Sequence, residues 1–394
     1  MNLNPVGWAS AALRLLARLD SDGVNSTTPV TEINGGAISA TNADIALVAK
    51  GTGATLAQAP DGTIAGGNKR GTGATDWQKT RINAANVASG VDSTISGGKN
   101  NTGSGLTATI AGGNSNTASG QDSAVGGGFG NNASAQQSAI CGGNGNTASN
   151  TYSFVGGGQS NTASTSTHAT VCGGNGSTAS GSYSFVGGGA SHTVSGSTAT
   201  VCGGNTNTAS GEASTVCGGR QNTANSAHSF IGGGRRGTAR SIAGYQVFPA
   251  CDVPIADAVG VSQSALLLLG RQTTDATATV LASNSSAAGT TNQVILPNNS
   301  AYSFSGEVIA GVTGAGNTAR WTIDGAIKRG ANAASTTMVG TATVTMTHND
   351  AGAAAWVVAV TADTTNGGIA VTVTGAAATT IRWVCKINTT EMTY

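Results

Sequence analysis

The fold of this chain is decided by a short motif that reads SFVGGGQSNTAS at residues 153–164 and STVCGGRQNTAN at residues 214–225. Each copy contains an Ile or Val, one further residue, two glycines and then a Thr-Ala-Ser-like triplet. Ten copies follow one another, and the Ile or Val positions, called anchors below, recur every 15 residues apart from one step of 16. The anchors are Ile95, Ile110, Val125, Ile140, Val155, Val171, Val186, Val201, Val216 and Ile231. A fixed short period is the signature of stacked coils, so residues 91–247 are predicted to form a β-roll or β-solenoid.

The composition argues against an enzyme and against a nucleic-acid-binding protein. Only 9% of the 394 residues are charged, 4% are aromatic, 61 are Gly, and the formal net charge is +1. The densest basic group, Arg235, Arg236 and Arg240, is one short cluster rather than a basic face. The four histidines are scattered, so we expect no metal site, no cofactor and no catalytic residues. The chain is therefore expected to have a structural or binding role.

The interior that one coil can offer is small. Counting from the anchor, the glycines at +2 and +3 are expected at a corner, and a second short strand near +8 places a small apolar residue inside. A buried Val or Ile contributes about 1.5–3 kcal/mol, whereas ordering each of 15 residues costs roughly 1–2 kcal/mol. Additional apolar burial is therefore expected from another source.

Residues on either side of the anchor suggest that source. Three anchors have Phe before them and Gly after them, and these aromatic residues are Phe154, Phe185 and Phe230. Three other anchors have Thr before them and Cys after them, and these cysteines are Cys172, Cys202 and Cys217. Positions −1 and +1 share the strand face opposite the anchor, and a large side chain at one of them accompanies a small one at the other. This compensation indicates that space is limited on the outer side of the strand as well as in the interior. We therefore predict that these six residues pack between subunits of a homotrimer, with the cysteines as small buried residues that form no disulfide framework.

These repeats resemble the stacked-coil β-roll of trimeric adhesin heads, and more closely the GG-x-x-NTASG arrays of bacteriophage tail-fibre proteins. The resemblance extends to ADIALVAKGTGATLAQAPDGTIAGGNKRGTGATDWQ (43–78), ILPNNSAYSFSGEVIAGVTG (295–314), WTIDGAIKRGA (321–331) and IRWVCKINTTEMTY (381–394). It implies a virion fibre, assembled in the host cytoplasm, that attaches to other tail, baseplate or collar proteins through its N-terminus. The same resemblance implies that the C-terminal domain contacts a host cell-surface glycan or protein.

The flanking segments predict two further domains. Residues 1–30 contain a short amphipathic helix whose stripe includes Trp8, Leu15, Leu16 and Leu19; it could dock on its own trimer or anchor the fibre in the virion. Residues 31–90 lead into the array through irregular first coils, with Ile64 as an early anchor. Alternating apolar residues over 248–394 predict a β-sandwich or jelly roll, the candidate tip domain. We find no bilayer-spanning run and no signal peptide in the sequence.

Candidate receptor contacts in that domain are Trp321, which could stack on a sugar or lie in the core, and the cations Arg320, Lys328 and Arg329. Two other functions remain open. A tailspike-type polysaccharide depolymerase would need a pair of carboxylates, for which Glu307, Asp324, Asp350 and Asp363 are available. An ice-binding β-solenoid would use the regular Thr-x-Ser columns of the coils.

Overall fold

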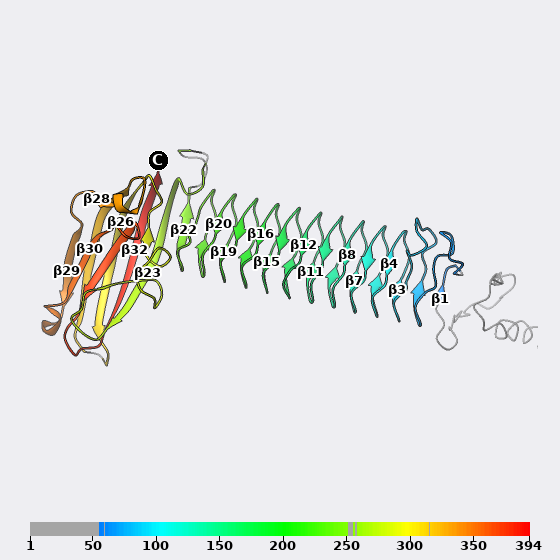
Figure 1. The fold of residues 1–394 in the computed structure, drawn as a ribbon, viewed down its shortest axis with the longest axis horizontal. Helices are drawn as coiled ribbons and strands as arrows, with labels where there is room; N and C mark the ends of the chain where they lie inside the picture. The colour runs from blue at the N-terminus through cyan, green and yellow to red at the C-terminus, as the bar shows by residue number, and fades with distance from the viewer. Residues whose placement is uncertain (1–54, 59, 251–254, 257, 315) are drawn as a thin grey trace, which may run out of the picture.

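The computed structural model describes residues 55–58, 60–250, 255–256, 258–314 and 316–394. Over this part the chain is all-β: a β-solenoid of about 12 turns is followed by further β-sheets (Figure 1). This confirms the predicted solenoid. The predicted N-terminal helix, with Trp8, Leu15, Leu16 and Leu19, lies outside the described residues. Within the described residues, no helix has the length and apolar character needed to cross a bilayer.

Most coils of the solenoid contribute two short strands, one at the anchor and one near position +8, and successive coils pair in parallel. The anchor strands are β1 (Thr55–Leu56), β2 (Thr75–Asp76), β3 (Thr94–Ile95), β5 (Thr109–Ile110), β7 (Ala124–Val125), β9 (Ala139–Ile140), β11 (Phe154–Val155), β13 (Thr170–Val171), β15 (Phe185–Val186), β17 (Thr200–Val201), β19 (Thr215–Val216), β21 (Phe230–Ile231) and β22 (Gln246–Pro249). The second set is β4 (Thr102–Gly103), β6 (Thr117–Ala118), β8 (Asn132–Ala133), β10 (Thr147–Ala148), β12 (Thr162–Ala163), β14 (Thr178–Ala179), β16 (Thr193–Val194), β18 (Thr208–Ala209) and β20 (Thr223–Ala224). The 16-residue step keeps the register, because Val155 still pairs with Val171.

The anchors and the small residues at +8 line the interior, as predicted, and are almost completely buried. The glycine at +3 is required by both conformation and space. Gly128, for example, has φ +86°, and a Cβ on it would lie 2.1 Å from the carbonyl oxygen of Gly143 in the next coil. Coils can therefore stack at their close spacing only if this corner carries no side chain.

A ladder of buried asparagines at position +6 also runs through the solenoid, and it was not predicted. Asn131 is typical: its Oδ1 accepts the backbone N–H of Asn146 at 3.0 Å, and its Nδ2 donates to the carbonyls of Gly127 at 2.8 Å and Gly143 at 3.0 Å. Three of the ten coils depart from the pattern, with Ser177, His192 and Gly237 in this position. The ladder satisfies corner carbonyls and amides that would otherwise be buried without partners.

The N-terminal coils replace an apolar anchor by a buried ion-pair cluster. Asp76 occupies the anchor position, and its Oδ2 lies 2.9 Å from Nε of Arg70 and 3.2 Å from an Nη of Arg81, with all three side chains buried. The prediction that Ile64 is an anchor was wrong, because its side chain is 56% exposed in a turn. The 63–67 segment carries the motif letters without the strand pairing that defines a coil.

The C-terminal domain consists of two antiparallel sheets that share one core. The larger sheet contains β23 (Ser262–Thr273), β32 (Ile381–Thr393), β26 (Ser300–Val312), β27 (Thr318–Arg329), β28 (Thr337–Met338) and β29 (Thr343–Asn349). The smaller sheet contains β24 (Thr279–Val280), β25 (Val294–Ile295), β30 (Val357–Asp363) and β31 (Gly368–Thr374), and two 3-10 turns lie at Ala333–Ser335 and Ala351–Ala353. The run Leu266 to Leu269, whose role the sequence left open, lies within β23, with Leu267 and Leu269 in the core and Leu268 exposed.

The solenoid and the C-terminal domain are joined by a continuous sheet and by a buried polar cluster. Strand β22 pairs in parallel with β21 and antiparallel with β23, so the anchor sheet continues into the larger C-terminal sheet (Figure 1). Glu391 on β32 is 2% exposed and accepts hydrogen bonds from Tyr245 and, at 2.9 Å, from Arg240 of the last coil. Burial and the Glu391 charge raise the pKa of Tyr245 well above its usual value, so its hydroxyl remains a donor. The shaft and the terminal domain are thus fixed to each other.

Candidate functional site

The outward side of the anchor sheet, called the outer face below, carries the six residues predicted to pack between subunits. Phe154 and Phe230 are half-buried, Phe185 is 36% exposed, and Cys172, Cys202 and Cys217 are exposed free thiols. In the single chain these thiols are exposed, so their burial between subunits stays a prediction. Positions −1 and +1 of the ten predicted coils include no charged residue.

The outer face continues without interruption onto the C-terminal domain. Phe230 contacts Phe248 edge-on, with ring centroids 6.4 Å apart, and Phe248 is followed across the larger sheet by exposed Leu268, Val384 and Ile309. A shallow groove of about 230 Å³ lies along this path, between Phe248 and the outward side chains of β23, β26 and β32. The outer face is thus uncharged along the coils and over the groove beside Phe248, whereas farther along the larger sheet Lys386 and Glu307 lie on the same face as Leu268 and Ile309.

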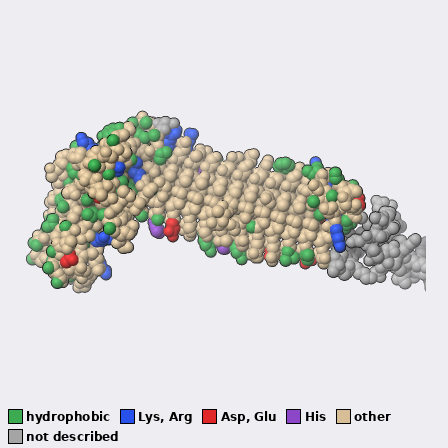
Figure 2. Space-filling view, viewed as in Figure 1, with side chains coloured by type: hydrophobic (Ala, Val, Ile, Leu, Met, Phe, Trp, Pro, Cys, Tyr) green, Lys and Arg blue, Asp and Glu red, His purple; other side chains and the backbone are tan. Residues whose placement is uncertain are grey.

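A second surface of the solenoid, called the coil edge below, is formed by positions −4 and −3 of each coil. In the ten predicted coils, the −3 residue has φ between 51° and 63° although it is never Gly. Three consecutive −3 residues are Tyr152, His168 and Tyr183, whose rings stack with centroids 4.7 and 4.6 Å apart. In the view of Figure 2, histidine side chains appear along the lower edge of a solenoid surface with few charges at its centre.

The ring contacts of this stack offset only part of the cost of its backbone conformation. A bulky residue with left-handed φ costs about 1–2 kcal/mol, and each aromatic pair contributes about 0.5–1.5 kcal/mol beyond its buried area. His168 belongs to the 16-residue coil, so the stack also connects that irregular coil to its two neighbours. The sequence analysis did not predict that these rings stack.

The four candidate receptor contacts do not form one site. Trp321 is 3% exposed and packs against Trp383 with ring centroids 5.6 Å apart, so its ring belongs to the core and is not available for stacking on a sugar. Arg320, near the start of β27, pairs with Glu307 at 2.8 Å. Lys328 is exposed near the other end of the strand, whereas Arg329 donates to the carbonyl oxygen of Leu296 at 2.5 Å and supports a loop.

The four candidate carboxylates also do not form one site. Glu307 and Asp324 are diagonal neighbours on the exposed side of β26 and β27, a relation that places the two residues roughly 7–8 Å apart, with their Cβ atoms somewhat closer. Asp350 and Asp363 instead accept backbone N–H groups in loops, and these hydrogen bonds lower the pKa of Asp363 against the effect of its burial. In the described part of the chain, no group of three or more His, Cys, Asp or Glu side chains could hold a metal ion.

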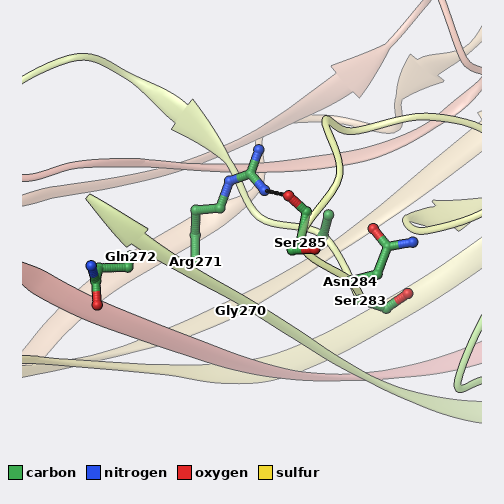
Figure 3. Close-up of a pocket in the computed structure, with 7 residues that line it drawn as sticks. Gly270, Arg271, Gln272, Ser283, Asn284 and Ser285 are labelled. Atoms are coloured by element: carbon green, nitrogen blue, oxygen red, sulfur yellow. Dashed lines mark hydrogen bonds between the residues drawn. The ribbon is translucent and has the colours of Figure 1, made fainter. Parts of the chain in front are cut away.

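A pocket of about 540 Å³ opens at the edge of β23 in the C-terminal domain (Figure 3). Arg271 forms one wall, where its guanidinium donates to the carbonyl oxygens of Ser285 at 2.7 Å and Ser286 at 3.0 Å. The pocket is lined by Gly270, Arg271, Gln272, Ala282, Ser283, Asn284 and Ser285. This lining can hydrogen-bond a polar ligand, but it includes no carboxylate, histidine or thiol for acid–base or nucleophilic chemistry.

Comparison with known proteins adds little to this geometry. No protein-family model matches the sequence, and no curated protein matches it significantly. Among solved structures, the chain is similar to the tailspike protein of Acinetobacter phage vB_ApiP_P1, with 9% identity over 82% of this chain and 71% of that one. The TM-score is 0.23, so this likeness carries no argument about function.

Proposed function

We propose that this protein is a structural and adhesive fibre of a bacteriophage virion, with no enzymatic activity. A shaft of about 12 turns, roughly 60 Å long at strand spacing, ends in a compact domain fixed to it by the Glu391 cluster. Such a rigid rod is suited to hold a terminal domain away from a surface. The phage assignment rests on the repeat motif and on the flanking segments that resemble tail fibres.

The fibre assembles as a homotrimer through the outer face. The observation that carries this proposal is the uncharged outer face of the coils, which continues past exposed Phe185 and Phe248 to the groove on the C-terminal sheet, because contiguous exposed apolar side chains on a protein surface mark interaction sites. Light scattering coupled to size exclusion tests it. A mass of about 114 kDa, three times the chain mass of 38.1 kDa, is expected, and a monomer would overturn the proposal.

In this proposal the N-terminal segment attaches to other virion proteins, and the C-terminal domain contacts a host cell-surface glycan or protein. The purified full chain should then compete with the phage for adsorption to sensitive cells. The full chain is the appropriate reagent, because a fragment starting at residue 248 would lack Arg240 and Tyr245, the buried partners of Glu391. Release of oligosaccharides from host capsule in the same assay would instead indicate a depolymerase, for which Glu307 and Asp324 are the first pair to mutate.

One observation favours a second candidate function. The strands β4 to β20 align Thr at +7, except for Asn132, and Ser at +9, except for Asn225, in two columns along a regular parallel sheet, a pattern that could match the spacing of an ice surface. Thermal hysteresis of a dilute solution of the protein would support ice binding. Its absence together with a trimeric mass would leave the fibre as the function to pursue.

A further inference from the structure

We propose that the coil edge around Tyr152, His168 and Tyr183 is a carbohydrate-binding strip on the shaft, separate from any contact made by the C-terminal domain. This inference goes beyond the proposed fibre function, because it assigns a ligand to the solenoid itself. The ligand class is a neutral, hydroxyl-rich polysaccharide.

The aromatic rings occupy positions that the backbone itself disfavours. Tyr152, His168 and Tyr183 have φ of 61°, 63° and 55°, a region that bulky L-residues rarely adopt. Aspartate and histidine adopt this conformation more readily than tyrosine, and the same column also carries Asp92, Thr107 and Thr198. Because every coil has this φ at −3, the conformation belongs to the coil, and what distinguishes these three residues is that their rings stack on one another.

The stack leaves one aromatic face open. Tyr152 and Tyr183 are 48% and 59% exposed although each is stacked on His168. The free face of Tyr183 is directed toward the next coils, where the −3 residues are Thr198 and then Ala213. Thr198 and Ala213 are smaller than Tyr183, so the coil edge is lower beyond the tyrosine ring. This lower stretch ends at exposed His228, three coils and roughly 14 Å away.

The neighbouring side chains suit a sugar more than an ion or an apolar peptide. Beside the rings, position −4 presents the hydroxyls of Thr151, Thr167, Ser182 and Ser197 in successive coils. Between Asp122 and Glu212, positions −4 and −3 contain no Asp, Glu, Lys or Arg. A pyranose presents apolar C–H groups on one face and hydroxyls at its rim, so it can stack on a Tyr face and hydrogen-bond to such a row.

The test uses the full-length protein and an array of neutral bacterial capsular and O-antigen polysaccharides, followed by calorimetry with the best binder. We expect Tyr183→Ala to weaken binding at least tenfold and Tyr183→Phe, which retains the ring, to weaken it less than threefold. Thr107→Ala, at the same position five coils away, is the matched control and should bind as the parent does. Circular dichroism and size exclusion confirm that each variant remains folded and assembled.

Amide hydrogen exchange in the presence of the best binder locates the site and separates this inference from the proposed receptor role. Protection within residues 150–200 that disappears in Tyr183→Ala supports the strip. Protection confined to 262–394 overturns the strip while leaving the role of the C-terminal domain intact. Equal affinity of the parent and Tyr183→Ala, or no binding to any polysaccharide on the array, also overturns it.

Discussion

His192 is the weakest member of the internal polar ladder, and replacing it by Asn should stabilise the solenoid. Its Nδ1 accepts the backbone N–H of Asn207 at 3.1 Å, but its Nε2 is buried without a partner. An Asn in the same place would retain the bond to Asn207 and could donate to the carbonyls of Gly188 and Gly204, as its counterparts do in other coils. Two added hydrogen bonds, at about 0.5–1.5 kcal/mol each, predict a gain of about 1–3 kcal/mol.

The same substitution should remove a pH dependence. Burial lowers the pKa of His192 below its usual 6.5, and protonation would also turn Nδ1 from the acceptor for Asn207 into a donor. The unfolded chain therefore binds this proton more readily than the folded chain as the pH falls below 6.5. The stability contributed by the neutral ring is complete above that pH and decreases on acidification by at most about 1.4 kcal/mol per pH unit, until the folded-state pKa is reached.

Denaturant unfolding of the parent and His192→Asn at pH 7.5, 6.0 and 5.0, followed by far-ultraviolet circular dichroism, tests both statements. The difference between the two proteins should be smallest at pH 7.5 and grow toward pH 5.0. Ser177→Asn is the control: it adds the same amide bonds one coil earlier but changes no titratable group, so its gain should not vary with pH. A His192→Asn variant that is less stable than the parent at every pH would refute the reasoning.

Three further substitutions test other parts of the molecule. Asp76→Asn should destabilise the N-terminal coils by about 3–5 kcal/mol, because it leaves two buried arginines without their counter-charge, and loss of exchange protection confined to residues 60–105 would show it. Glu391→Gln should loosen the junction through loss of its ion pair with Arg240, seen as separate melting transitions for shaft and terminal domain where the parent has one. Phe185→Ala should lower the midpoint of trimer dissociation in light scattering; an unchanged midpoint would remove Phe185 from the interface.

Much of the architecture could be predicted from the sequence because the repeat imposes it. Once the anchors such as Val155 and Val171 were aligned, the parallel register and the buried Ala at +8 followed, and the strands of the C-terminal sandwich followed from alternating apolar residues. The hydrogen bonds at the corners of the coils could not be predicted in the same way. An Asn such as Asn146 looks like a polar turn residue in sequence, and only the stacking of the coils reveals that its amide bridges two of them.

The surfaces were harder to predict, because a periodic sequence specifies the direction in which a side chain points but not what covers it. Cys202 was expected to be buried and is exposed in the single chain, and Trp321 was considered as a sugar contact and lies in the core. Both observations follow from one fact: residues that alternate along a strand share a face, and the identity of that face depends on packing partners far away in the sequence. What covers a face such as that of Cys202 is therefore determined by the assembly. An accessibility measurement gives a direct check: if the trimer forms through the outer face, thiol-specific labelling of Cys202 should be slow in the native protein and fast after dissociation.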